Sequence, residues 1–306
     1  MRHSLYWDDF ESRIKETANC INNNLPVPVR RVAVFVTDRC NLKCQYCNLP
    51  QHGHTMDETR FDNIINKHKE AIFHITGGEP SIVKWLYPYL KTHQGRFHLN
   101  TNAIIEPPFD NIQRLKISLD SHIPEVWNKL VGLEGAFDRV VNNIKKSLDK
   151  TTTSITCVIN KSNYQALPDF VRFCNNNFPG LYAVFFSVYK GTNPNFVLDT
   201  KDVDLFFNNI KPQLESILPQ ESLALLQETI DDKVRVMQGV RFPNNTGRCY
   251  VSLSERVYDW EKEGYCSHLY RDGVYNCPSM YTHAKCLYGC NQKLVAFNNE
   301  VAKLLV

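Results

Sequence analysis

The chain has 306 residues, of which 43% are hydrophobic and 22% are charged. This composition excludes a disordered or collagen-like protein and predicts one large folded domain, with or without an appendage. Lys and Arg number 35 against 32 Asp and Glu, and no basic run is long enough to indicate a nucleic-acid-binding stripe. Asp8, Asp9, Glu11 and Glu16 occupy the region where a signal peptide would be apolar, and no apolar stretch approaches the roughly 20 residues of a transmembrane helix. We therefore expect a cytoplasmic protein that does not bind membranes.

Eleven cysteines are an unusual number for a chain of this length without an export signal. In a small secreted protein they would indicate disulfides, whereas clusters at short spacing in a reducing compartment indicate metal or iron-sulfur ligation. Three of them, Cys20, Cys157 and Cys174, fall at apolar positions of expected helices and strands, and we expect them in the core. The clustered cysteines are therefore the first candidates for a functional site.

The residue pattern divides the chain into four segments. Residues 1–30 hold an amphipathic helix. Residues 31–190 alternate short apolar strands with helices, which is typical of βα units around a parallel sheet. Residues 191–246 are expected to form a helical connection, and residues 247–306 hold five of the eleven cysteines before a C-terminal helix.

The expected elements follow one another in a regular order. Several strands are apolar on consecutive residues, which predicts a sheet covered on both faces. The six strands are expected at Arg31–Val36, Ala71–Ile75, Arg96–Asn100, Arg114–Leu119, Ser154–Ile159 and Leu181–Val188. The helices are expected at Leu5–Ile21, Asp57–Glu70, Ser81–Thr92, Ala136–Asp149, Tyr164–Asn177, Lys201–Leu218, Glu221–Gln238 and Gln292–Leu305, with a short irregular connection after the third strand.

The first cysteine cluster follows the first strand directly. Cys40, Cys44 and Cys47 are separated by three and then two residues, so their thiolates can converge from one loop. A 4Fe-4S cluster normally takes four cysteines, and three local ligands would leave one iron open to another ligand. The alternatives are structural zinc, which prefers two separated pairs of ligands, and buried thiols, for which a surface loop is a poor place.

This loop, with the aromatic Tyr46 just before its third cysteine, resembles the hallmark of the radical S-adenosylmethionine enzymes. Three more segments resemble motifs of that family: the glycine-rich Thr76–Pro80 and the strand ends Leu99–Asn102 and Ile117–Asp120. Each lies at the carboxyl end of an expected parallel strand, where barrel-type folds place their active sites. The resemblance covers about residues 31–190.

The resemblance implies an α/β fold, a partial (β/α)6 TIM-like barrel, in which the three cysteines hold a catalytic 4Fe-4S cluster. S-adenosylmethionine would bind the open iron through its amine and carboxylate, and one electron would cleave it to methionine and a 5′-deoxyadenosyl radical. That radical would abstract hydrogen from the substrate, while the protein supplies binding and orientation. By analogy the cofactor-binding residues are Gly77, Gly78 and Glu79 at the methionine end, Asn100, Asn102 and Ser118 at the ribose, and Tyr46 near the adenine.

The second cysteine cluster consists of two pairs. Cys266 and Cys277 flank Asp272-Gly273, a strong hairpin signal that would bring the two thiols together. Cys286 and Cys290 are four residues apart and would share one face of a helical turn. Two such pairs can close one site.

The C-terminal region resembles the SPASM and Twitch auxiliary-cluster extensions of the radical S-adenosylmethionine family. Met280 stands where the full SPASM pattern has a cysteine, and no cysteine follows Cys290. The better fit is a small Cys-rich module with one auxiliary Fe-S cluster held by Cys266, Cys277, Cys286 and Cys290, with Cys249 in reserve. A zinc ribbon is the alternative, because it is also built from two separated cysteine pairs.

Three functions are compatible with these motifs. The first is an oxidoreductase or modifying enzyme acting on a peptide, protein or small metabolite, assisted by the auxiliary cluster and an electron donor such as flavodoxin or ferredoxin. The second resembles the molybdenum-cofactor cyclase, whose opening motif is close to Thr37–Asn41, although its two-glycine C-terminus is missing and its auxiliary spacing differs. The third is a non-catalytic Fe-S or zinc protein on the same scaffold. The resemblance favours the first.

Overall fold

The structure is a computed structural model. It describes residues 10–25, 27–28, 31–47, 49, 51, 53–189, 191, 193–219, 222–223, 226–227, 230, 248–249, 255–257, 275–276 and 292–306. Within these residues, no helix is both long and apolar enough to cross a membrane.

A parallel sheet forms the centre of the fold, with its strands in the order β6-β5-β4-β3-β2-β1-β8. All six expected strands are present, which confirms the α/β prediction. The seventh, β8, was not predicted; it comes from the segment assigned to the Cys-rich module and pairs in parallel with β1. The strands are β1 Arg31–Phe35, β2 Ile72–Thr76, β3 Arg96–Thr101, β4 Ile112–Ser118, β5 Thr152–Ile159, β6 Ala183–Val188 and β8 Glu255–Val257, and a separate antiparallel pair is formed by β7 Arg248–Cys249 and β9 Tyr275–Asn276.

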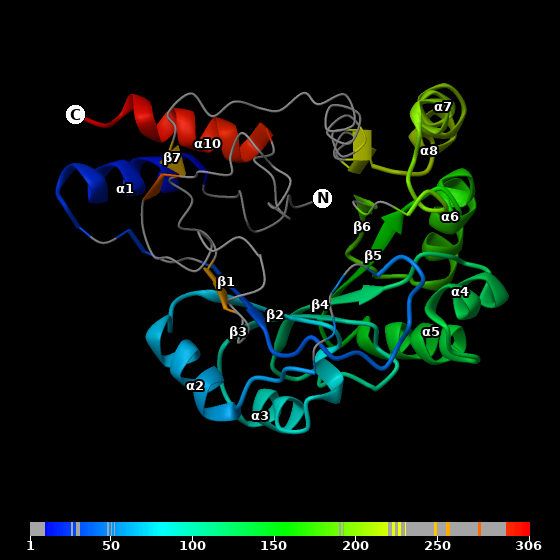
Figure 1. Ribbon diagram of the computed structural model, residues 1–306, viewed down its shortest axis with the longest axis horizontal. Coiled ribbons are helices and arrows are strands. Elements are labelled where there is room, and N and C mark those ends of the chain that lie inside the picture. The colour runs from blue at the N-terminus through cyan, green and yellow to red at the C-terminus, as the bar shows by residue number, and fades with distance from the viewer. Residues whose placement is uncertain are drawn as a thin grey trace.

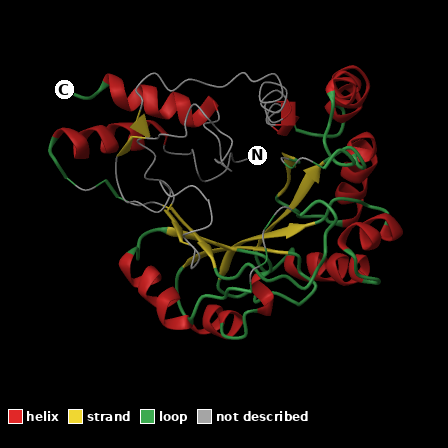
Figure 2. Cartoon of the chain, in the orientation of Figure 1, coloured by secondary structure: helices red, strands yellow, loops and turns green. Residues whose placement is uncertain are grey.

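Figures 1 and 2 show the sheet as a curved layer with helices α2 to α6 along its outer side. One of them, α4, was missed by the sequence analysis, and the helix expected at 221–238 lies mostly outside the described residues. The segment from α7 to α8 includes a π-helical turn at Phe206–Ile210, just before Pro212, whose ring excludes regular α-helical bonding there. The helices are α1 Phe10–Asn22, α2 Glu58–Lys67, α3 Leu86–Thr92, α4 Pro124–Val131, α5 Ala136–Ser147, α6 Leu167–Asn177, α7 Thr200–Leu205, α8 Lys211–Glu215 and α10 Gln292–Lys303, with 3-10 turns at Pro80–Ile82 and Tyr164–Ala166.

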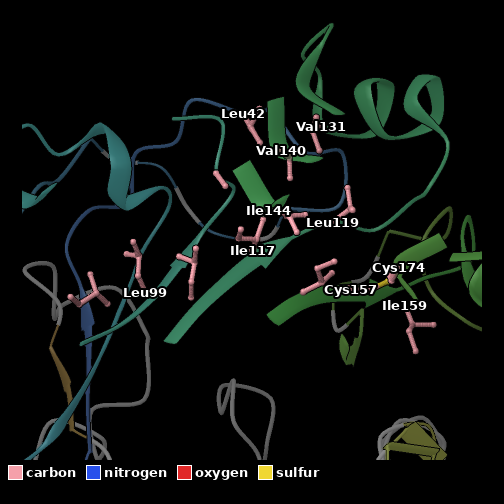
Figure 3. Packing of buried hydrophobic residues seen from close by; sticks show 14 of the residues in the cluster. Leu42, Leu99, Ile117, Leu119, Val131, Val140, Ile144, Cys157, Ile159 and Cys174 are labelled. Atoms are coloured by element: carbon pink, nitrogen blue, oxygen red, sulfur yellow. The ribbon is translucent and has the colours of Figure 1, made fainter. Parts of the chain in front are cut away.

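The hydrophobic core lies between the sheet and these outer helices. Alternate residues of strands β1 to β6 point into it, and Figure 3 shows Ile117 of β4 and Cys157 of β5 among side chains from α5 and α6. Cys157 is fully buried and Cys174 is 1% exposed. Cys20 is also buried, so the prediction that these three cysteines belong to the core is confirmed.

The other, concave face of the sheet carries many polar side chains, yet His98, Arg114 and Ser154 on this face are buried, as expected for a sheet covered on both faces. In β3, His98 and Asn100 alternate with core residues. In β4, Arg114 and Lys116 alternate with core residues in the same way. The rings of His74 and His98 meet edge to face, with centroids 4.8 Å apart. The strands therefore present a polar surface to the inside of the curve.

Helices α1 and α10 pack side by side, away from the main core (Figure 1). Ile14 and Ala18 of α1 form a small buried cluster with Phe297 and Val301 of α10. The Asn22 side chain strengthens the contact, because its Nδ2 donates to the Leu304 carbonyl at 2.9 Å. The two helices thus depend on each other for burial of their apolar faces.

Replacing Phe297 by Ala is expected to lower the free energy of unfolding by about 3 kcal/mol, because the ring is fully buried in a cluster too small to refill the space. Urea denaturation followed by circular dichroism measures this loss. Leu304→Ala is the matched control, since Leu304 is 45% exposed and its removal should cost far less. Equal losses in the two variants would contradict the packing of α10 on α1.

Candidate active site

The cysteine loop is held in place by the end of α4. The backbone N–H of Lys43 donates to the Val131 carbonyl at 3.0 Å, and that of Gln45 donates to the Leu130 carbonyl at 2.9 Å. A helix leaves its last carbonyls without partners inside the helix, so these acceptors are available to a neighbouring loop. Gly132 ends α4 in the left-handed conformation, with φ 72°, which glycine adopts without strain. The unpredicted helix therefore positions the cysteines.

The glycine-rich loop joins the cysteine loop through the backbone. The Gly78 N–H donates to the Thr37 carbonyl at 2.7 Å, and the Glu79 N–H donates to the Arg39 carbonyl at 2.9 Å. A Cβ atom at Gly77 would lie 2.3 Å from the Thr37 oxygen, and one at Gly78 would lie 2.2 Å from the Arg39 oxygen. The glycines are thus required for two loops to approach each other, and the two motifs form one unit.

Gly77→Ala is expected to reduce the iron retained after anaerobic reconstitution, because the new methyl group would push the glycine-rich loop away from the cysteine loop. Gly180→Ala is the matched control. Gly180 also has a positive φ, +89° against +148° for Gly77, but has no atom within 4 Å of its Cβ position. Both variants carry the backbone strain, and only Gly77→Ala should lose iron; equal iron in both would contradict the coupling of the two loops.

Glu79 connects the glycine-rich loop to the end of β3. Its side chain is 1% exposed. One oxygen accepts from the Ser81 N–H at 2.9 Å and from the Thr101 hydroxyl at 2.6 Å, and the other accepts from the Asn102 N–H at 2.7 Å. Burial raises the pKa of this carboxyl group, while the hydrogen bonds oppose that rise. The carboxylate therefore holds the loop and the strand end together.

A second loop supports the start of the cysteine loop. The Thr37 hydroxyl donates to the His54 carbonyl at 2.7 Å. The fully buried Asp38 accepts from the Gly53 N–H at 3.0 Å and lies 3.2 Å from His54 Nδ1. The side chains just before Cys40 are thus fixed by hydrogen bonds.

The three loop thiols influence one another electrostatically. Cys40 and Cys44 are half-buried, and Cys47 is exposed. The pKa of Cys44 is raised to about 12, chiefly by burial, then by the carboxylate of Asp120 and by the other two thiols. Burial also raises the pKa of Cys40. A charge on either of the other two thiols therefore opposes ionisation of Cys44.

The donor set of this loop fits an iron-sulfur cluster better than a single metal ion. Among the residues that the structure describes, no three His, Cys, Asp or Glu side chains converge closely enough to hold one ion. In a 4Fe-4S cluster each thiolate binds a different iron, so its ligands do not meet at one point. Three partly accessible thiols on one fixed loop satisfy that requirement.

Tyr46 is anchored to the end of β4. Its hydroxyl donates to the carboxylate of Asp120, which is 2% exposed and also accepts from the Val158 N–H at 2.6 Å. Burial raises the pKa of Asp120 to about 6 and raises that of Tyr46 as well. The Tyr46 ring packs edge to face on Phe196, with centroids 6.1 Å apart. The aromatic ring of the motif therefore has a fixed orientation.

The three residues expected at the ribose differ in the hydrogen bonding and exposure of their side chains. The Asn102 side chain donates to Asn41 Oδ1 at 2.8 Å and accepts from the Ile104 N–H at 3.0 Å. Asn100 instead has a buried Oδ1 atom with no hydrogen-bond partner, and Ser118 is exposed. Asn100 and Ser118 are therefore better placed to take a ligand than Asn102.

Several residues on which this geometry depends were not predicted from the sequence. Asp120 and Thr101 were only parts of motifs, and Arg114 was only the first residue of an expected strand. Thr101 and Asp120 could have been found from their position, since they lie at or just after the carboxyl ends of β3 and β4, where the motifs gather. Arg114 lies nearer the start of β4, and its signal was its alternation with core residues. The auxiliary ligands expected at Cys266, Cys277, Cys286 and Cys290 lie outside the described residues, and of the reserve ligand Cys249 only the backbone, in β7, is described.

Comparisons with known proteins agree with this geometry. Residues 34–174 match the family model of the Radical SAM superfamily. A probable GTP 3′,8-cyclase of Methanocaldococcus jannaschii is 25% identical over 242 residues, 72% of this chain and 79% of that protein. A GTP 3′,8-cyclase of Clostridium botulinum is 31% identical over 168 residues, 47% of this chain and 52% of that protein. The chain thus spans about half the length of several of the relatives it matches.

Solved structures share the fold. The chain resembles anSMEcpe with bound AdoMet, with a TM-score of 0.53 and 17% identity over 91% of this chain and 83% of that one. It also resembles SuiB of Streptococcus suis, with a TM-score of 0.51 and 16% identity over 71% of this chain and 52% of that one. At these identities the likeness concerns the fold alone. Residues 34–174 are a domain of the radical SAM superfamily, and the chain is an enzyme that uses a 4Fe-4S cluster and S-adenosylmethionine.

Proposed function

We propose that Cys40, Cys44 and Cys47 hold the catalytic cluster and that the enzyme acts on a purine nucleotide. The observation that carries the proposal is the backbone junction between the cysteine loop and Gly77–Glu79, which fixes both family motifs at one end of the sheet. When bound, the cluster and S-adenosylmethionine supply a one-electron cleavage that gives methionine and a hydrogen-abstracting 5′-deoxyadenosyl radical.

The residues of the chain bind and orient the reactants. Because Gly77 and Gly78 have no side chains, their backbone lies close beside the cysteine loop, where it would bind the methionine end of S-adenosylmethionine. Glu79 holds that backbone in place. Tyr46, held by its hydrogen bond to Asp120, presents its ring to the adenine. Asn100 and Ser118 offer polar atoms to the ribose.

The choice of a nucleotide follows from the relatives. Those named above are GTP 3′,8-cyclases, and they favour the cyclase-like alternative over the peptide or protein modification that the sequence analysis preferred. Closing a bond between the 3′ and 8 positions of GTP requires loss of the 3′ hydrogen to 5′-deoxyadenosine. One electron and one proton must then reach the resulting base radical, so the product has the mass of GTP. An auxiliary Fe-S cluster, or an external donor such as flavodoxin or ferredoxin, would supply that electron.

The test is an anaerobic incubation of reconstituted, dithionite-reduced protein with S-adenosylmethionine and GTP, followed by mass spectrometry. We expect 5′-deoxyadenosine together with a GTP isomer that has a new retention time. 5′-Deoxyadenosine without conversion of GTP would retain the radical chemistry and reject this substrate. Absence of both, with the cluster present, would reject the proposed function.

We further propose one auxiliary cluster in the Cys-rich segment and a location in the reducing cytoplasm, where eleven thiols remain unoxidised. Changing Cys277 and Cys290 together to Ala is expected to lower the bound iron from about eight to about four atoms, the content of one 4Fe-4S cluster. Iron, sulfide and zinc analysis measures this, with the core variant Cys174→Ala as control. Unaltered iron stoichiometry would mean that this segment binds zinc or no metal.

A further inference from the structure

The concave face of the sheet carries a buried cation, Arg114, which has no role in the function proposed above. Arg114 of β4 is 4% exposed, and its guanidinium lies 4.7 Å from the ring centroid of Tyr182 and 5.0 Å from that of Phe185. Its Nε and Nη2 atoms are buried without hydrogen-bond partners, and none of the described carboxylates forms an ion pair with it. A buried charge without a counter-charge is costly, so an anion bound here would stabilise the protein.

The unpartnered edge of the guanidinium has the shape of an oxyanion site. Nε and one Nη carry two parallel N–H bonds, which match two oxygens of a single phosphate or carboxylate group. Desolvation lowers the pKa of Arg114, and the interaction of the guanidinium with the Tyr182 side chain only partly opposes this. The Tyr182 and Phe185 rings form no hydrogen bond with the Nε and Nη2 atoms, so a ligand can bind that edge of the guanidinium.

Two neighbouring strands add further unpartnered polar atoms. Ser154 of β5 is fully buried, and its Oγ has no hydrogen-bond partner. The strand register places Ser154 opposite Lys116, which in turn lies opposite Asn100. Three adjacent strands thus hold polar groups in one row, directly beside Arg114. Lys116 adds a second positive charge, with its Nζ 4.8 Å from the Phe185 ring.

We infer that Arg114, with Ser154 and Lys116 beside it, binds a phosphate group of the substrate on the concave face of the sheet. This inference rests on the proposed function, because a nucleotide supplies the phosphate. Ser118, at the proposed ribose site, lies four residues farther along β4, which is about 13 Å of strand. A nucleoside phosphate spans a distance of that order, so its phosphate reaches Arg114 while its sugar stays near the radical. Phosphate suits two cations better than a carboxylate, because it carries more charge and more oxygen atoms.

The test compares full-length, reconstituted protein with its Arg114→Met variant. The unfolding midpoint is measured without ligand and with GTP, pyrophosphate, guanosine or acetate, and the GTP affinity is measured by titration calorimetry. For the wild type, GTP and pyrophosphate should raise the midpoint, and guanosine and acetate should not. Arg114→Met should raise the ligand-free midpoint by removing a buried unpaired charge, abolish the pyrophosphate shift and weaken GTP binding about 10- to 100-fold.

The matched control is Arg96→Met, at the exposed start of β3, where the Arg96 side chain donates only to the Glu70 carbonyl. It should leave the ligand shifts unchanged. A lower ligand-free midpoint with an intact pyrophosphate shift in Arg114→Met would assign Arg114 a purely structural role and overturn the inference. Equal shifts with acetate and pyrophosphate would indicate a carboxylate substrate and overturn the choice of phosphate.

A separate assay distinguishes this inference from the proposed function. Formation of 5′-deoxyadenosine by the wild type, without any pyrophosphate shift, would reject the phosphate site and retain the radical chemistry. A pyrophosphate shift that depends on Arg114, in a protein that forms no 5′-deoxyadenosine, would retain the site and reject the proposed function.

Discussion

Replacing Cys40, Cys44 and Cys47 together by Ala is expected to abolish 5′-deoxyadenosine formation, to the background measured without protein. The physical reason is loss of all three thiolates that we propose as cluster ligands, since no other described side chains gather there to replace them. The fold should persist, because Cys47 is exposed and the other two are only half-buried. Chromatographic quantification of 5′-deoxyadenosine, with circular dichroism on the same samples, measures both effects.

The core cysteines provide a matched control with the opposite outcome. Cys157 and Cys174 lie in the main hydrophobic cluster (Figure 3), and either change to Ala should lower the free energy of unfolding by about 1 to 2 kcal/mol. Both variants should still form 5′-deoxyadenosine once reconstituted. Unchanged 5′-deoxyadenosine in the triple variant, or iron retained at the wild-type level, would refute the assignment of the loop cysteines.

The second large effect is expected for Glu79→Gln, which should lower the free energy of unfolding by about 3 kcal/mol and reduce the retained iron. All three groups that face the carboxylate are donors: Ser81 N–H, the Thr101 hydroxyl and Asn102 N–H. A glutamine must direct its own NH₂ group at one of these sides, which leaves a buried donor facing a donor. Urea denaturation gives the stability, and iron analysis after reconstitution gives the effect on the site.

Glu106→Gln serves as control for the loss of one carboxylate. Glu106 is half-exposed and pairs with Lys146 at 2.5 Å, so its neutralisation should change the free energy of unfolding by less than about 1 kcal/mol. Thr101→Val should give an intermediate loss, because it removes one of the three donors to Glu79. A Glu79→Gln variant that unfolds at the wild-type urea concentration would show that these hydrogen bonds do not hold the loop.

The sequence predicted the framework of the site because the framework is local. The three cysteines, the two glycines and the strand ends are short motifs, and alternating strands and helices place them at one edge of a parallel sheet. Helix α4 was missed, although Pro124 at its start and Gly132 after its end are ordinary signals, because its eight residues are few for a periodic pattern.

The remaining features depend on contacts between segments far apart in the sequence. Glu79 was predicted at the methionine end of S-adenosylmethionine, and its hydrogen bonds to Ser81, Thr101 and Asn102 are not indicated by any spacing rule. The polar side chains of the concave face were visible in the alternation of Arg114 and Lys116 with core residues, but that alternation does not indicate that Arg114 is buried. Pairing of β8 with β1 could not be predicted from three residues in a cysteine-rich segment.

The packing of α1 on α10 has a consequence for synthesis of the protein. Asn22 and Leu304, which share a hydrogen bond, are 282 positions apart. Strands β1 to β6 are all available once Val188 has left the ribosome, whereas α10 begins only at Gln292. At roughly 5 to 20 residues per second, the apolar face of α1 waits about 5 to 20 s for its partner after the sheet can form. During that interval α1 presents Ile14 to the surroundings. The nascent protein is therefore expected to need a chaperone at this helix more than at its sheet.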